Sequence, residues 1–105
     1  MTTTTTVKQV ECEFDDIYRI TCENGLVLDI SEDSAPKVGS EIEYSVYSIP
    51  SAVSTGFTLM NGILFQTSPV NILVSFGGLL GDIPVTEQLK ATLTESVSVV
   101  YCLKN

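Results

Sequence analysis

The chain of 105 residues has no histidine and no tryptophan, and it has only three cysteines. Without histidine, the familiar nucleophile–base pairs of hydrolases cannot be assembled. A structural zinc site normally takes four cysteine or histidine ligands, and Cys12, Cys22 and Cys102 lack the spacing of such ligands. Acids in predicted turns, such as Asp15 and Asp16, are better explained as solvated groups bonded to nearby backbone. We therefore expect a chain that is not an enzyme by itself and that has no cofactor or metal site.

Basic residues are scarce as well. Lysine and arginine number 5 against 13 acidic residues, which gives a net charge of −8. The basic residues are spread along the chain as Lys8, Arg19, Lys37, Lys90 and Lys104. Affinity for nucleic acid or for anionic lipid depends largely on clustered lysine and arginine. We therefore expect no strong direct binding to nucleic acid or membranes, whereas the acidity suits a basic protein partner.

Long apolar runs are also missing. No stretch approaches the roughly 18 apolar residues of a membrane-spanning helix. Met1 is followed by five threonines, without the basic start and apolar stretch of a secretory signal. Reduced cysteines in a cytoplasmic protein are then the simplest interpretation. We expect residues 1–6 to be a disordered tail and residues 7–105 to form a single β-barrel domain.

Alternating apolar and polar residues are the main pattern that the chain does contain, and this period of two is typical of half-buried strands. Strands are predicted at 7–14, 18–22, 26–30, 41–49, 57–66, 71–76 and 96–103, and one short helix at 86–94. Cys12 and Cys22 lie on apolar faces of their strands, so we expect both in the core. Seven to eight short strands without long crossovers predict an all-β fold, a closed antiparallel barrel or a sandwich.

The segment around Asn24-Gly25 predicts a hairpin with a defined register. A two-residue loop would place Ile20 beside Asp29 on one face. A three-residue loop, Glu23-Asn24-Gly25, instead pairs Cys22 with Leu26, Ile20 with Leu28 and Tyr18 with Ile30, which unites the apolar residues. We therefore predict the three-residue loop, with Gly25 in the left-handed region.

A second glycine pair, Gly77-Gly78, lies within a strand pattern and predicts a sharp bend, a bulge or a close backbone approach. It is part of Val74-Ser75-Phe76-Gly77-Gly78-Leu79-Leu80, which resembles the Ser-aromatic-Gly-Gly-Leu-Leu signature of the eighth small subunit shared by the eukaryotic nuclear RNA polymerases. Further segments resemble that family in the same order: Phe14-Asp15-Asp16-Ile17, Ile17-Tyr18-Arg19-Ile20-Thr21-Cys22-Glu23, Leu26-Val27-Leu28-Asp29-Ile30, Val38-Gly39-Ser40, Leu59-Met60-Asn61-Gly62 and Val99-Val100-Tyr101-Cys102-Leu103-Lys104.

The chain differs from the eukaryotic members of that family in three respects. The chain is shorter, the long acidic loop shrinks to residues 51–56, and Gly81-Asp82 replaces the family's Met-Arg. In these respects the chain resembles the shorter archaeal counterpart of the eukaryotic protein, a small component of the archaeal DNA-directed RNA polymerase.

The resemblance implies a barrel related to the oligonucleotide-binding fold (OB-fold). It also implies a non-catalytic subunit of DNA-directed RNA polymerase, acting in transcription. Such a subunit would dock on the largest subunit near the pore and funnel and support the assembly and stability of the core.

Two groups of residues are candidates for docking. The first comprises Phe76, Gly77, Gly78, Leu79 and Leu80, in which either leucine faces outward if the glycines bend the strand; the alternative places both leucines in the core. The second is the outward pair Tyr47 and Ile49. Two other functions stay open: a free β-barrel that binds single-stranded nucleic acid or a small ligand, and an acidic adaptor for another basic protein.

Overall fold

The computed structural model describes residues 2–48, 53 and 55–104. Its strands are β1 (Thr3–Phe14), β2 (Ile17–Cys22), β3 (Val27–Ser31), β4 (Glu41–Tyr47), β5 (Thr58–Thr67), β6 (Asn71–Phe76), β7 (Leu79–Pro84) and β8 (Ser96–Lys104). Every neighbouring pair is antiparallel, and the strands close in a ring in the order β1-β2-β3-β7-β6-β5-β8-β4, with β4 paired back to β1. The predicted all-β antiparallel fold is confirmed.

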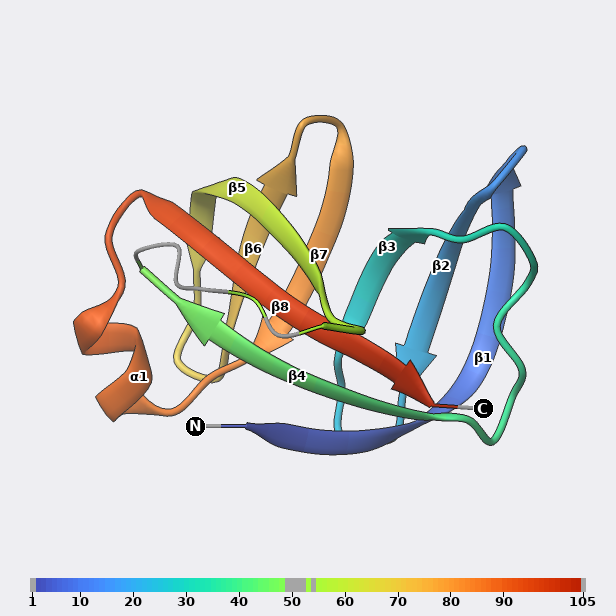
Figure 1. The fold of residues 1–105 in the computed structure, drawn as a ribbon. Coiled ribbons are helices and arrows are strands. Elements are labelled where there is room, and N and C mark those ends of the chain that lie inside the picture. Colours follow the sequence, from blue (N-terminus) through green and yellow to red (C-terminus); the bar gives the residue numbers. More distant parts are fainter. Residues whose placement is uncertain (1, 49–52, 54, 105) are drawn as a thin grey trace.

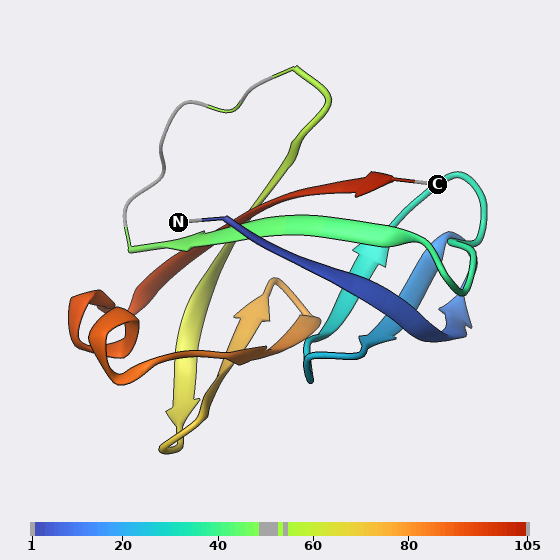
Figure 2. The ribbon, with the colours of Figure 1, turned by 90° about the horizontal axis from the view of Figure 1, so that it is seen from below.

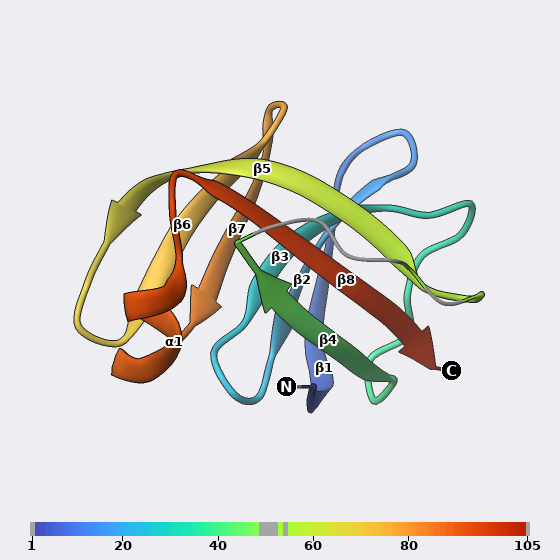
Figure 3. The same cartoon turned by 60° about the vertical axis from the view of Figure 1, so that its left-hand side comes forward.

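The ring has two groups of consecutive strands, β1–β3 and β5–β7, which lie on opposite sides of the view in Figure 1. Strands β4 and β8 run diagonally side by side and connect these groups on one side, because β8 pairs with both β4 and β5 (Figure 3). On the other side the connection is the β3–β7 ladder, in which only Val27↔Asp82 and Leu28↔Gly81 are paired.

The core fills the ring with the inward side chains of all eight strands. Its buried members include Ile20, Leu28, Ile42, Ile72, Val74, Ile83, Val97 and Val99. These residues alternate with outward polar or half-buried positions, as the period of a strand requires. The alternation in the sequence therefore predicts which side chains form the core in β2, β3, β4 and β8.

The predicted three-residue hairpin is confirmed in its register. Ile20 pairs with Leu28 and Tyr18 with Ile30. The Cys22 N–H donates to the Leu26 carbonyl at 2.8 Å, and Gly25 has φ +99°. Cys22 is fully buried, and this burial raises the pKa of its thiol to about 11.

The predicted disordered tail is wrong for residues 3–6. They belong to β1 and pair with β4, from Thr3↔Tyr44 to Thr6↔Glu41 (Figure 2). Threonine is β-branched and favours extended backbone, and the pairing covers an edge of β4 that would otherwise be open. Thr5 is buried, and its hydroxyl accepts the Asn24 N–H at 3.2 Å.

The core position expected for Cys12 is also wrong, because its side chain is exposed. The pairing of β1 with β2 shifts register between Val7 and Gln9 and again between Cys12 and Phe14, so the alternation does not run through the strand unbroken. Phe14 is 65% exposed. This end of the hairpin lies at the edge of the molecule, beyond the core (Figure 1).

The predicted short helix is present as α1 (Glu87–Thr92), with Thr86 as its N-cap. The Thr86 hydroxyl accepts the Leu89 N–H at 3.1 Å. Nowhere in the part of the chain that the structure describes is there a helix long and apolar enough to cross a membrane.

Candidate docking face and pocket

The glycine pair forms a two-residue hairpin turn between β6 and β7. Phe76 and Leu79 pair directly across it, and Gly77 and Gly78 have φ +69° and +104°. Positive φ at both central residues is the requirement of a type I′ turn, which glycine meets without steric cost. The predicted sharp bend is therefore confirmed as a hairpin turn.

Phe76, the aromatic residue of the signature segment, lies in the core and is 8% exposed. Its ring occupies space that two glycines leave free. A Cβ atom on Gly62 would lie 2.7 Å from Phe76 Cδ1, and one on Gly81 would lie 2.8 Å from Phe76 Cε2. The side chain therefore packs the interior and is not presented on the surface.

The two leucines after the turn point in opposite directions. Leu79 is half-buried and packs against the core, whereas Leu80 is 42% exposed. The sequence left two alternatives open, one leucine facing outward or both leucines in the core, and the structure has the first. The outward residue is Leu80.

Leu80 belongs to an apolar surface that the sequence pattern did not single out. Leu80 pairs with Ser75 on β6, and Ser75 pairs with Ile63 on β5, so the three side chains form one outward row. Ile63 is 63% exposed, and Phe65, at the register shift of β5 between Leu64 and Gln66, is 56% exposed. We call the outward side chains Ile63, Phe65, Ser75 and Leu80 the β5–β7 face. The sequence of β5, in which Ile63, Leu64 and Phe65 are consecutive apolar residues, gave no alternation to separate its outward from its inward residues.

The backbone of Leu80 is held in place by a carboxylate from another strand. Where the β3–β7 ladder ends, the Leu80 N–H donates to Asp29 Oδ2 at 3.0 Å. Arg19 on β2 donates to the same carboxylate from Nε (2.8 Å) and from its terminal nitrogen (3.1 Å). These bonds with Asp29 are the main cause of the raised pKa of the Arg19 guanidinium, and Glu13 adds an ion pair at 3.0 Å.

The charges on the surface are mostly negative. Three of the five basic residues are engaged by carboxylates: Arg19 as described, Lys90 by Glu87 at 3.2 Å and Lys104 by Glu43 at 2.7 Å. The excess of acids is therefore only partly offset within the chain. Among the described residues, no group of three or more histidine, cysteine or acidic side chains is arranged to hold a metal ion.

The second predicted candidate, Tyr47 with Ile49, is not brought to the β5–β7 face. Tyr47 is half-buried on β4 and pairs with Ser98. Around the ring β8 lies between β4 and β5, and Ser98 pairs in turn with Asn61 on β5, so Tyr47 is one strand removed from the edge of the face. Ile49 lies outside the described residues.

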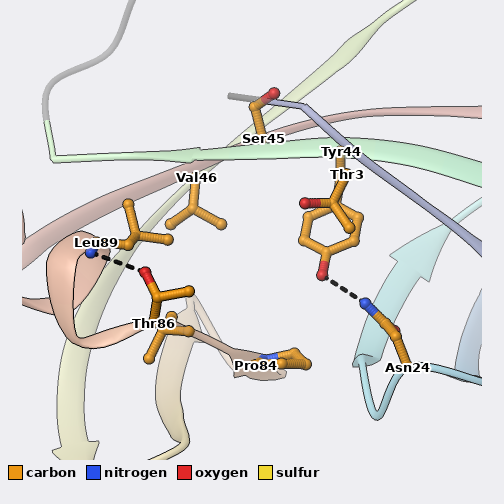
Figure 4. A pocket seen from close by; sticks show the side chains of 9 residues that line it. Thr3, Asn24, Tyr44, Ser45, Val46, Pro84, Thr86 and Leu89 are labelled. Carbon is orange, nitrogen blue, oxygen red and sulfur yellow. Dashed lines mark hydrogen bonds between the residues drawn. The ribbon is translucent and has the colours of Figure 1, made fainter.

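A pocket of about 290 Å³ lies at the end of the ring next to α1 (Figure 4). Its lining comes from β1, the β2–β3 turn, β4, the end of β7, the connection that follows and α1. It comprises Thr3, Asn24, Tyr44, Ser45, Val46, Pro84, Val85, Thr86 and Leu89. Every lining side chain is apolar or neutral. Tyr44 is 4% exposed, and its hydroxyl accepts a hydrogen bond from Asn24 Nδ2 at 3.0 Å.

No protein-family model matches this chain, and no curated protein matches it. The resemblance to the polymerase subunits therefore stays a prediction that rests on the motifs quoted above.

Proposed function

We propose that this chain is a non-catalytic small subunit of a multisubunit DNA-directed RNA polymerase, with a closed barrel related to the OB-fold. It docks on the largest subunit near the pore and funnel, and it supports assembly and stability there. The observation that carries the proposal is the outward Leu80 in the Gly-Gly-Leu-Leu segment, because the segment that most resembles the family also contributes to an exposed apolar face.

Contacts between the other motif segments support the proposal. The Arg-containing segment contributes Arg19, the next segment contributes Asp29, and the two meet at the backbone of Leu80. Gly62 of the Met-Asn-Gly segment leaves room for Phe76 of the signature segment. Four segments that carry the resemblance therefore cooperate in placing one hairpin and its outward leucine.

The face has the properties of a modest protein interface. Complete burial of an exposed leucine, isoleucine or phenylalanine stabilises a complex by roughly 1.5–3 kcal/mol. Ile63, Phe65 and Leu80 are each about half exposed, so burying what remains contributes roughly 2–5 kcal/mol. The net charge of −8 favours encounter with a basic surface and helps to select the partner.

The test is affinity purification of the full tagged chain from its native cell in moderate salt, with the co-purifying proteins identified. We expect the large polymerase subunits in near-equal amounts. Leu80→Asp places a charge in the face and should weaken retention roughly 10–100-fold. Val38→Asp is the matched control, because Val38 is an exposed apolar residue in the loop between β3 and β4.

The outcomes separate the parts of the proposal. If the unmodified chain emerges without polymerase subunits, the proposed function is wrong. If the subunits appear but Leu80→Asp and Val38→Asp retain them equally, the function stands and the docking face lies elsewhere. Thermal unfolding of both variants, compared with the unmodified chain, shows whether a loss of retention reflects docking or folding.

An acidic adaptor for another basic protein is the second candidate. The apolar face and the negative charge favour it equally, since only the motif resemblance specifies a polymerase. Co-purification with an unrelated basic protein, sensitive to Leu80→Asp, would identify this function instead.

A further inference from the structure

We propose that the pocket beside α1 is a binding site for a small neutral molecule that combines an apolar body with one hydrogen-bond acceptor, and that the Tyr44 hydroxyl donates to that acceptor. This site is separate from the β5–β7 face. The inference does not depend on the proposed polymerase role.

The hydrogen bonds around Asn24 determine which way the Tyr44 hydroxyl can donate. The Leu26 N–H donates to Asn24 Oδ1 at 3.1 Å, which assigns the other amide atom, Nδ2, as the one facing Tyr44. Nδ2 is a donor, so the Tyr44 oxygen accepts this bond at 3.0 Å (Figure 4). The hydroxyl hydrogen of Tyr44 is not used by that bond, and no acceptor for it is found among the described residues.

Tyr44 stays a donor at physiological pH. Burial is the main cause that raises the pKa of its hydroxyl above the usual value, so the group keeps its hydrogen. The rest of the side chain is buried in the core cluster, which fixes the ring. A buried tyrosine normally satisfies its hydroxyl hydrogen, and here the space beside it is the pocket.

The remaining walls define the class of ligand. Val46, Pro84, Val85 and Leu89 supply apolar surface, and the lining contains no charged side chain. A charged ligand would lose its hydration without gaining a counter-charge, so the site selects neutral molecules. The volume of about 290 Å³ lies at the lower end of the range of small-molecule sites, which is roughly 300–1,000 Å³. These properties match a small ketone, ester or amide with a ring or short chain.

Two probes of the same shape test the role of the acceptor. Acetophenone and α-methylstyrene differ only in a carbonyl oxygen replaced by a methylene group. Each is titrated into the full chain, with NMR of the methyl groups of Val46, Val85 and Leu89. We expect both to shift these signals, and acetophenone to bind roughly 2- to 10-fold more tightly, as one hydrogen bond allows.

Two variants complete the test. Tyr44→Phe removes the donor and should make the affinities of the two probes equal; the freed amide of Asn24 reaches water, because Asn24 is exposed. Val46→Leu keeps Tyr44 and reduces the pocket volume, and should weaken both probes together. Equal affinities in the unmodified chain, a preference for acetophenone that survives Tyr44→Phe, or shifts confined to residues outside the pocket would each overturn the proposal.

Discussion

The side chain of Asp29 links residues that are far apart in the sequence. Its carboxylate is buried and joins three strands, because it accepts from Arg19 on β2 and from the backbone of Leu80 on β7 while belonging to β3. Nothing local in the sequence indicates the second contact, since 51 residues separate Asp29 from Leu80. By contrast, the pairing of Arg19 with Asp29 follows from the predicted hairpin register.

Asp29→Asn should destabilise the protein by about 1–3 kcal/mol. The charge-assisted hydrogen bonds are replaced by weaker ones, and the amide nitrogen of asparagine, itself a donor, faces an N–H group. Urea unfolding measures the loss. Glu23→Gln is the control, since Glu23 is an exposed acid in the turn that follows β2. Equal stability of the two variants would show that the Asp29 bonds contribute little.

The buried thiol of Cys22 should make the stability of the folded protein depend on pH in the alkaline range. Its thiol is neutral when protonated, and burial raises the pKa from 9.0 to about 11 in the folded state. The folded chain therefore holds the proton more tightly than the unfolded chain, so this contribution is complete below pH 9 and is lost as pH rises toward 11. We expect a loss of about 1.4 kcal/mol for each pH unit in this window.

Urea unfolding between pH 8 and pH 10.5 tests this expectation. Cys22→Ala should flatten the profile over that range, although it lowers stability overall. Cys12→Ala, at an exposed position, should leave the profile unchanged. Tyr101, whose burial raises its pKa to about 12, adds a similar loss only above pH 10. A profile that stays steep in Cys22→Ala would contradict the assignment.

At the scale of elements, the hairpins were the most predictable features. In the β2–β3 hairpin, only one loop length unites the apolar residues, so local pattern and register agree. The β6–β7 turn was marked by its glycines, but β7 itself has no clear alternation because Gly81 occupies an inward position beside the Phe76 ring. The β5–β7 face could not be predicted from the sequence, because its outward row is formed by pairing between three strands.

The type I′ turn can be tested at Gly77. Gly77→Asn should keep the stability of the protein within about 1 kcal/mol or raise it, because asparagine tolerates positive φ and a Cβ at this position meets no neighbour. Gly77→Val should cost about 1–2 kcal/mol, because a β-branched residue is strained there. Thermal unfolding compares the two, and similar losses in both would argue against a left-handed residue at position 77.

At the scale of the whole molecule, closure of the ring depends on segments far apart in the sequence. The alternation predicted strands and an antiparallel fold, and it left barrel and sandwich open. The order of strands around the ring, with β8 between β5 and β4, comes from pairings that no local pattern specifies. The first residues of β1 illustrate this, since a polar run that reads as a tail becomes ordered through its pairing with β4.

Removing residues 2–5 should therefore lower the free energy of unfolding by roughly 2–4 kcal/mol, as several ladder hydrogen bonds and the bond from Asn24 to Thr5 are lost. The edge of β4 would also be left open, so we expect self-association in light scattering. Thr4→Ser keeps the backbone pairing and should remain monomeric to the same degree as the unmodified chain. A shortened chain with unchanged stability would show that this pairing is dispensable.

The place of β8 between β4 and β5 has a consequence for how the protein is made. β8 is the last strand along the chain, and two of the eight ladders of the ring require it. During synthesis, the β1–β3 and β5–β7 groups emerge first and can form their local hairpins, but the ring cannot close until residues 96–104 have left the ribosome. A nascent chain stalled before β8 would expose the edges of both β4 and β5 to other chains.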